Sequence, residues 1–252
     1  MTETGLHSAL VWAVLLLAPL TACLLMVISA PYGRHGRAGW GPTASARWSW
    51  LVMESPSVLV FLGVYALGEH RAAPVPLLFL AMWQVHYVHR TFIYPLRMKS
   101  TGRRTPFFVA LLAFLFTLVN AYINARWVSH LGTYSLEWLA NPRFVAGAAL
   151  FALGMGINLY SDGVLLKLRG PGQSGYKVPE GGLYKWVSCP NYLGEILEWI
   201  GWALATWSLA GVAFAAYTAA NLVPRSRSHH RWYHEQFPEY PKERKALVPF
   251  VF

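Results

Sequence analysis

The sequence predicts an all-α integral membrane protein, built as a bundle of seven transmembrane helices. Three observations lead to this fold class. The 252-residue chain is 55% hydrophobic and only 13% charged, whereas soluble domains carry about 25% charged residues. Apolar stretches recur along the chain at close to the ~20 residues that a membrane-spanning helix needs. Basic residues gather in alternate loops, as the positive-inside rule requires.

The apolar stretches define the predicted spans within one domain, residues 1–252. No basic residue precedes the first stretch, so we expect a membrane helix there and not a cleaved signal peptide. The last two stretches form one long run, which fits either a helical hairpin or a single kinked pair. No internal repeat or alternating strand pattern is visible. The predicted spans are residues 8–30, 48–67, 74–95, 106–128, 144–161, 191–206 and 207–223.

The basic residues assign each loop to a side of the membrane. With seven spans, one side receives loops 31–47, 96–105 and 162–190 and the tail 224–252, which together hold 17 of the 21 Lys and Arg residues. This asymmetry predicts a cytoplasmic tail and an N-terminus on the outer or lumenal face. It also explains the net charge of +10 without a nucleic-acid partner.

The second span carries a carboxylate inside an apolar run. Glu54 lies in the stretch SWLVMESPSVLVF, residues 49–61. A charge at the bilayer centre costs at least ~2.5 kcal/mol, so intramembrane charges usually face a cavity. We therefore expect Glu54 to face a cavity and not lipid.

Three further spans carry polar side chains on one helical face, because residues three, four and seven apart align. In a membrane such groups mark a functional site by default. Any one of them, or His86 or His89, could instead only form hydrogen bonds between helices. The aligned residues are Tyr87, Arg90, Thr91 and Tyr94 in the third span, Asn158 and Asp162 in the fifth, and Asn191, Glu195 and Glu198 in the sixth.

The loop 162–190 and the C-terminal tail predict a nucleotide-binding mouth. The loop is rich in glycine and proline and carries basic and aromatic side chains, a composition that suits phosphate groups. It does not form a GxGxxG turn after a strand, so the soluble dinucleotide-binding fold is not indicated. The basic, aromatic tail could lie on anionic lipid or cover a bound nucleotide. The two cysteines, Cys23 and Cys189, lie too far apart for a CxxC metal pair, and we expect no metal site.

Five stretches resemble the steroid 5α-reductase family of integral membrane enzymes. The similarity is dense over the last hundred residues and weak over the first forty. Related enoyl-reductase and sterol-reductase branches share mainly the C-terminal features. The five stretches are HYVHRTFIYP (86–95), GMGINLYSD (154–162), LRGPG…GYKVPEGGL (168–183), NYLGEILEWIGWALATWSL (191–209) and YPKERKALVPFVF (240–252).

The resemblance implies a seven-helix bundle whose loops and C-terminal tail cap a cofactor pocket. It implies that the protein binds NADPH and reduces the C4–C5 double bond of a 3-oxo-Δ4-steroid, which enters from the bilayer. Membrane lipid is then the surrounding partner, with no nucleic acid and no obligate protein partner. Glu54 and Tyr87 fall where the family contacts the steroid 3-carbonyl, and Met53 stands where relatives have a glutamine.

The resemblance also implies cofactor contacts. The segment PLRMKSTGRRTP, residues 95–106, departs from the family pattern, so the phosphate contact is left open among Arg97, Arg103 and Arg104. The residues that fall on cofactor positions are Tyr94, Arg97, Asn158, Asp162, Arg169, Tyr176, Lys177, Asn191, Glu195, Arg225, His229 and Tyr233.

The chemistry of an enone explains why these residue types are needed. Hydride adds to C5 only because the resulting negative charge moves to the C3 oxygen, so the site must stabilise an oxyanion. Tyr87 can donate a hydrogen bond to that oxygen. Glu54 can donate only as a neutral acid, a form that apolar surroundings favour, or it can orient Tyr87. The group that protonates C4 is solvent or a residue that the sequence does not identify.

Three alternatives remain open. The substrate could be another conjugated enone or enoyl lipid. The protein could be a membrane methyltransferase that uses S-adenosylmethionine, although the many basic residues at the mouth favour a cofactor with phosphates. It could also be a small transporter or receptor in which Glu54 and His86 relay protons, although no paired half-repeats are visible.

Overall fold

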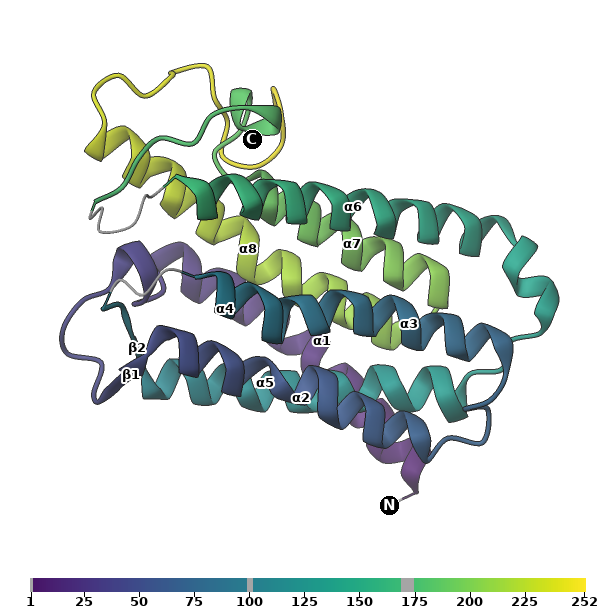
Figure 1. Cartoon of the computed structure of the whole chain (residues 1–252). Coiled ribbons are helices and arrows are strands. Elements are labelled where there is room, and N and C mark those ends of the chain that lie inside the picture. Colours follow the sequence, from purple (N-terminus) through teal and green to yellow (C-terminus); the bar gives the residue numbers. More distant parts are fainter. Residues whose placement is uncertain (1, 99–101, 169–174) are drawn as a thin grey trace.

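The structure is a computed structural model that describes residues 2–98, 102–168 and 175–252. Over these ranges the chain is mostly helical, and its long helices run side by side (Figure 1). The α-helices are α1 (Glu3–Val27), α2 (Ala46–Ala66), α3 (Pro74–Val88), α4 (Tyr94–Arg97), α5 (Phe107–Arg126), α6 (Pro142–Lys167), α7 (Pro190–Thr206) and α8 (Leu209–Gln236).

Shorter elements join these helices. Two segments have π-helical hydrogen bonding, η2 (His89–Ile93) and η3 (Trp127–Leu131). Three are 3₁₀ turns, η1 (Gly33–His35), η4 (Leu136–Ala140) and η5 (Gly182–Lys185). Two are strands, β1 (Thr43–Ser45) and β2 (Arg104–Pro106), which pair antiparallel. Strands of three residues are too short to show an alternating pattern in the sequence.

Four helices in the described part of the chain are long and apolar enough to cross a membrane. They are α1, α2, α5 with its continuation to Leu131, and α6. The protein therefore has the mostly helical, membrane-type architecture that the sequence predicts. Helices also lie over the other three predicted spans, as α3 to α4, α7 and α8.

Two separate helices, α7 and α8, form from the long apolar run near the C-terminus. Between them Trp207 has a left-handed backbone with φ 45°. Ser208 then caps α8 by accepting a hydrogen bond from the Gly211 amide at 2.9 Å. Beyond the predicted span, α8 continues to Gln236 and accommodates Pro224 inside the helix. The first part of the predicted tail is therefore helical.

Glycines spaced seven residues apart bring α6 and α7 into close backbone contact. A Cβ atom on Gly154 of α6 would lie 2.4 Å from the Glu198 nitrogen of α7, and one on Gly201 would lie 2.4 Å from the Phe151 nitrogen. Gly147 and Gly194 meet the partner helix in the same way. No larger residue fits this seam, which fixes where the polar face of α7 lies.

We expect Gly154→Leu to lower the melting temperature of the detergent-solubilised protein strongly, because overpacking a close contact typically costs about 1–3 kcal/mol. The matched control is Gly156→Leu on the same helix. A Cβ at Gly156 meets nothing within 4 Å, and leucine favours helix more than glycine does. Equal melting temperatures for the two variants would contradict the close packing of α6 on α7.

The described parts of the loops that the charge pattern assigns to one side lie together at one end of the helices, opposite to the N-terminus (Figure 1). His35 lies 2.9 Å from His229, measured between Nε2 and Nδ1. The C-terminal segment packs on the chain after η5, where the Ser188 amide donates to the Lys245 carbonyl at 2.8 Å. The tail is therefore held by protein contacts at this end.

A cluster of large aromatic rings lies between the helices and supports the site. Trp83 of α3 is fully buried, with its ring 4.4 Å from Phe61 of α2 and 5.4 Å from Trp199 of α7. Its indole nitrogen donates to the Ser57 carbonyl at 2.7 Å. Because these rings are closely packed and hydrogen-bonded, the neighbouring residues of α3 and α7 have fixed positions.

Candidate active site

A cavity of 430 Å³ opens among α1, α2, α3, α5 and α8. Its wall is mostly apolar, with side chains such as Leu24, Phe108 and Phe214. Its polar side chains include Glu54, His86, Tyr87, Arg90 and Glu195 from α2, α3, η2 and α7, together with Asn221 and Arg225 from α8. A mostly apolar cavity of this size with a few convergent polar groups is the usual form of a small-molecule site.

Glu54 and Tyr87 both line this cavity, from neighbouring helices. The Tyr87 ring is buried and packs on Trp83 and Trp199, with centroid distances of 4.9 Å and 5.5 Å. Glu54 thus faces the cavity, as the cost of a charge in lipid predicts.

The backbone around Glu54 is adapted to a proline two residues later. Pro56 has no N–H to donate to the Val52 carbonyl, and Ser55 Oγ donates to that carbonyl instead at 2.9 Å. Thr91 Oγ1 donates to the Glu54 carbonyl at 3.3 Å, and Thr117 Oγ1 donates to the Met53 carbonyl at 2.7 Å. These bonds hold this turn of α2 against η2 and α5.

Arg90 is the centre of a buried ion-pair network beside the cavity. Its guanidinium nitrogens lie 3.3 Å from Asp162 Oδ2 and 3.4 Å from Glu195 Oε2. It also stacks on the rings of Trp50 and Tyr94, at 4.7 Å and 5.4 Å from their centroids. Arg90 lies in the π-helical turn η2, and π-turns of this kind often occur at functional sites.

The predicted polar faces of α6 and α7 meet at this network. Asn191 Nδ2 donates to Asp162 Oδ1 at 3.0 Å, and Asn158 Nδ2 donates to the Asn191 carbonyl at 3.0 Å. Asn158 also reaches Glu195 Oε2 at 3.5 Å. The structure therefore brings together five residues predicted to contact a cofactor, these four and Tyr94, with Arg90 between them.

A second group of polar side chains lies between η1, α7 and the end of α8. Arg225 donates to the Tyr192 hydroxyl at 3.0 Å, and that hydroxyl lies 3.0 Å from His229 Nε2. Burial, followed by the charge of Arg34, lowers the pKa of His35 to about 4 and lowers the pKa of His229 well below its ordinary value. Both rings are therefore neutral at pH 7, so the positive charge here belongs to the arginines.

Arg34 lies in an aromatic cage at the same end. Its guanidinium is 4.8 Å from the Trp232 ring, 4.6 Å from the Tyr233 ring and 5.4 Å from the Tyr176 ring. Among the described residues its buried Nη1 has no hydrogen-bond partner. A guanidinium with an unused, buried donor nitrogen is suited to hold an anion.

The structure describes most of the other predicted cofactor residues. Arg97 is exposed at the end of α4 and does not line the cavity. Lys177 is also exposed. Arg169 lies outside the described residues. Arg103 stacks on Tyr176 at 5.0 Å, whereas Arg104 bonds to Thr43 in the β1–β2 ribbon. Of the three arginines left open, Arg103 is therefore the one beside the aromatic cage.

Three residues of these polar clusters are not among the site residues predicted from the sequence. Arg90 lies on the predicted polar face of the third span, but the sequence gives it no specific role. Arg34 lies in the first loop, where the resemblance is weak and no helical spacing guides the choice. Tyr192 follows a predicted cofactor residue, and only its contact with Arg225 marks it.

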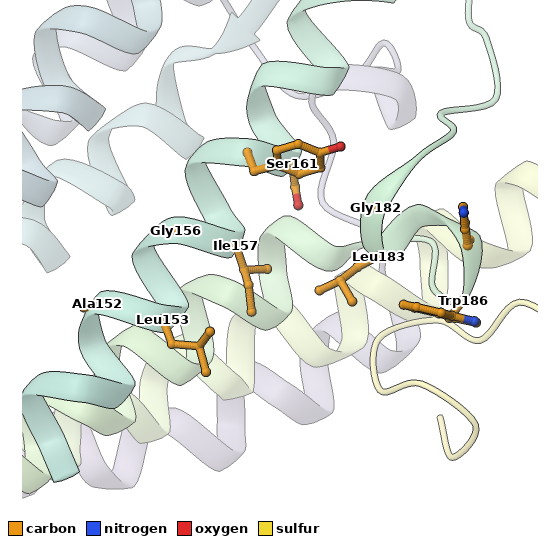
Figure 2. A pocket seen from close by; sticks show the side chains of 10 residues that line it. Ala152, Leu153, Gly156, Ile157, Ser161, Gly182, Leu183 and Trp186 are labelled. Atoms are coloured by element: carbon orange, nitrogen blue, oxygen red, sulfur yellow. The ribbon is translucent and has the colours of Figure 1, made fainter.

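A separate hollow of 550 Å³ lies on the outer side of α6, against η5. Figure 2 shows its side chains, which include Leu153, Ile157, Leu183 and Trp186. The wall is almost entirely apolar, and none of the predicted catalytic or cofactor residues belongs to it. The predicted catalytic residues Glu54 and Tyr87 line the cavity between the helices and not this hollow.

Fold and cavity together indicate a membrane protein with a largely apolar cavity beside a buried polar network. The sequence pattern of the family described as 3-oxo-5-alpha-steroid 4-dehydrogenase matches residues 103–252. The chain is 47% identical to the steroid 5-alpha-reductase DET2 of Arabidopsis thaliana, over 93% of this chain and 92% of that protein. It is 41% identical to the 3-oxo-5-alpha-steroid 4-dehydrogenase 1 of Bos taurus, over 100% and 99%.

The Homo sapiens 3-oxo-5-alpha-steroid 4-dehydrogenase 1 is 44% identical, over 88% of this chain and 86% of that protein. The chain therefore belongs to the steroid 5α-reductase family and is an oxidoreductase that acts on a CH–CH bond. The resemblance seen in the five sequence stretches is confirmed. Family membership favours a reductase over a methyltransferase, transporter or receptor.

Proposed function

We propose that this protein reduces the C4–C5 double bond of a 3-oxo-Δ4-steroid with NADPH as the hydride donor. The observation that carries the proposal is the convergence of Glu54 and Tyr87 on one mostly apolar cavity, next to the Arg90 network. The cavity volume of 430 Å³ is in the range of small-molecule sites. Membership of the steroid 5α-reductase family supports the choice of substrate class.

The residues at the mouth fit a phosphate-bearing dinucleotide. Arg34 has an unused buried donor, and Arg225 is a second cation. His35 and His229 are neutral, so the two arginines would supply the positive charge that binds the phosphates. Aromatic rings such as Trp232 provide stacking surfaces. Arg225 and Glu195 both line the cavity, so this mouth adjoins the cavity and the network of Asn158, Asp162, Asn191 and Glu195.

In the proposed mechanism, bound NADPH supplies a hydride to C5 of the steroid. Tyr87 donates a hydrogen bond to the C3 oxygen and stabilises the charge that develops there. Glu54 as a neutral acid donates a second hydrogen bond, or as an acceptor orients the Tyr87 hydroxyl. The surrounding apolar wall excludes water, which strengthens both interactions.

We propose seven membrane crossings, with the N-terminus outside and α8 ending in the cytoplasm. Helices lie over all seven predicted ranges, and the four basic segments gather at one end of them. NADPH would then enter from the cytosol, at the mouth formed by Arg34 and Arg225, while the steroid enters from the bilayer.

The direct test is to incubate membranes containing the protein with NADPH and testosterone, and to follow the loss of the enone absorbance. We expect a 5α-reduced product with NADPH and almost none with NADH or S-adenosylmethionine. Persistence of the enone under all conditions would contradict the proposed substrate. A panel of other conjugated enones then tests whether Met53, which lines the cavity, changes the substrate preference.

We expect Arg34→Gln to weaken NADPH binding by roughly 10- to 100-fold, because a hydrogen bond to a charged group contributes about 1.5–3 kcal/mol. The matched control is Arg37→Gln in the same loop, since Arg37 is exposed, donates to the Ser29 carbonyl at 3.1 Å and stacks on Trp40 at 5.6 Å, outside the aromatic cage. Binding is measured by the change in nicotinamide fluorescence. If both variants bind NADPH alike, the aromatic cage is not the cofactor mouth.

A further inference from the structure

A histidine and a glutamate form an isolated buried pair at the wall of the cavity. His86 Nδ1 of α3 lies 2.8 Å from Glu198 Oε1 of α7. Glu198 is 0% exposed, and its second oxygen has no hydrogen-bond partner among the described residues. Burying such a pair is costly, and linking two helices does not require charged groups. The cost of burying this pair therefore indicates that it has a function beyond linking the two helices.

His86 touches the cavity, whereas Glu198 does not. His86 lines the same wall as Glu54 and Tyr87, and its ring centroid is 4.8 Å from that of Tyr87. Glu198 engages Nδ1, so Nε2 is the ring nitrogen left for a ligand in the cavity. A carboxylate on one nitrogen fixes the orientation and tautomer of the ring.

The proposed reaction needs an acid at this place. Hydride addition at C5 leaves an electron pair shared between C4 and the C3 oxygen, and C4 is bonded directly to C3. If Tyr87 holds the C3 oxygen, a proton donor for C4 must lie beside Tyr87. His86 is the adjacent residue in the chain, and its ring packs edge-on against the Tyr87 ring.

The cavity wall carries other titratable groups besides His86. Arg225 donates to the Tyr192 hydroxyl and stacks on Tyr32, and the Tyr217 ring stacks on Phe116. Among the described residues, His86 is the titratable side chain whose ring packs on Tyr87. Arg90 and Glu195 belong to one ion-pair network. Glu54 and Tyr87 are assigned to the C3 oxygen. Glu198 is shielded from the cavity, so it can act only through His86.

We propose that His86 is the catalytic acid that protonates C4 and that Glu198 is its positioning residue. This step rests on the function proposed above. The electron pair at C4 takes the proton from His86 Nε2, the N–H bond breaks and its electrons remain on nitrogen. The steroid becomes the saturated ketone and His86 becomes a neutral imidazole, which regains a proton from water before the next turnover.

The test is the stereochemistry of hydrogen incorporation at C4. The purified enzyme converts testosterone with NADPH in D₂O, and NMR spectroscopy determines which face of C4 carries deuterium. A fixed acid delivers deuterium to one face, so we expect a single labelled position. Labelling of both faces by the unaltered enzyme would overturn the proposal, even if no variant folds. Incubating unlabelled product with enzyme in D₂O controls for later exchange.

Variants separate acid catalysis from a purely structural link. His86→Gln is expected to lower turnover by about 10²-fold or more, with NADPH binding kept and deuterium distributed over both faces. Glu198→Gln retains an acceptor for Nδ1, so it should lower turnover less and keep single-face labelling. The matched control, His89→Gln, changes a half-buried histidine outside the cavity wall and should behave like the unaltered enzyme.

Two outcomes would overturn the role of His86. One is near-normal turnover by His86→Gln, and the other is low turnover with single-face labelling retained. Both would mean that another fixed group supplies the proton. A failure of the unaltered enzyme to reduce any enone is a different result, because it would contradict the proposed function itself.

Discussion

Tyr87→Phe should lower the turnover of a 3-oxo-Δ4-steroid by about 10²-fold or more while leaving NADPH binding largely intact. The substitution removes only the hydroxyl group that is proposed to stabilise the oxyanion, and loss of one such donor typically costs 10²–10³ in kcat. The phenyl ring can keep its packing on Trp83 and Trp199. Glu54→Gln should have a similar effect, because an amide N–H is a weaker hydrogen-bond donor than a carboxylic acid and an amide oxygen is a weaker acceptor than a carboxylate.

A matched control separates chemistry from stability. Tyr65→Phe also removes one buried tyrosine hydroxyl, but that hydroxyl donates to the Arg71 carbonyl at 2.9 Å and does not line the cavity. We expect Tyr65→Phe to retain most of the activity. Turnover is measured from the enone absorbance at saturating NADPH, together with the melting temperature. Normal turnover by both Tyr87→Phe and Glu54→Gln would remove the proposed pair from the mechanism.

Helix positions follow from the sequence because hydropathy and span length determine them. The predicted range 48–67 corresponds to α2 (Ala46–Ala66), and 191–206 corresponds to α7 (Pro190–Thr206). The sequence left open whether residues 191–206 and 207–223 form a hairpin or a kinked pair, because the break depends on the left-handed backbone of Trp207, a residue type that gives no turn signal. The π-helical turn at His89–Ile93 also has no periodic signature.

The sequence predicts which polar residues on helices lie together better than it predicts the positions of polar residues in loops. Asn158, Asp162, Asn191 and Glu195 meet because spacing of three or four residues puts them on facing sides of α6 and α7. Arg34 lies in a short 3₁₀ turn, where no period relates a residue to its direction. Its proposed role follows from the packing of η1 against the end of α8, which the sequence does not predict.

Removing the guanidinium at the centre of the buried network should be the most destabilising single change among those considered. Arg90→Met leaves Asp162 and Glu195 without their cation, and breaking a buried pair by deleting one partner typically costs about 3–5 kcal/mol. Both carboxylates are largely buried, with side-chain exposures of 4% and 15%. We therefore expect a large loss of thermal stability in detergent.

The control is Arg104→Met, because Arg104 is exposed and bonds to the Thr43 hydroxyl at 2.7 Å. This change should cost little. A triple variant that adds Asp162→Asn and Glu195→Gln to Arg90→Met leaves no unpaired buried charge, so it should recover much of the lost stability. If Arg90 also orients the bound cofactor, NADPH affinity stays low in the triple variant. If Arg90→Met leaves the melting temperature unchanged, Asp162 and Glu195 must be solvated by water or protonated when Arg90 is absent. The network would then not be what holds η2 against α6 and α7.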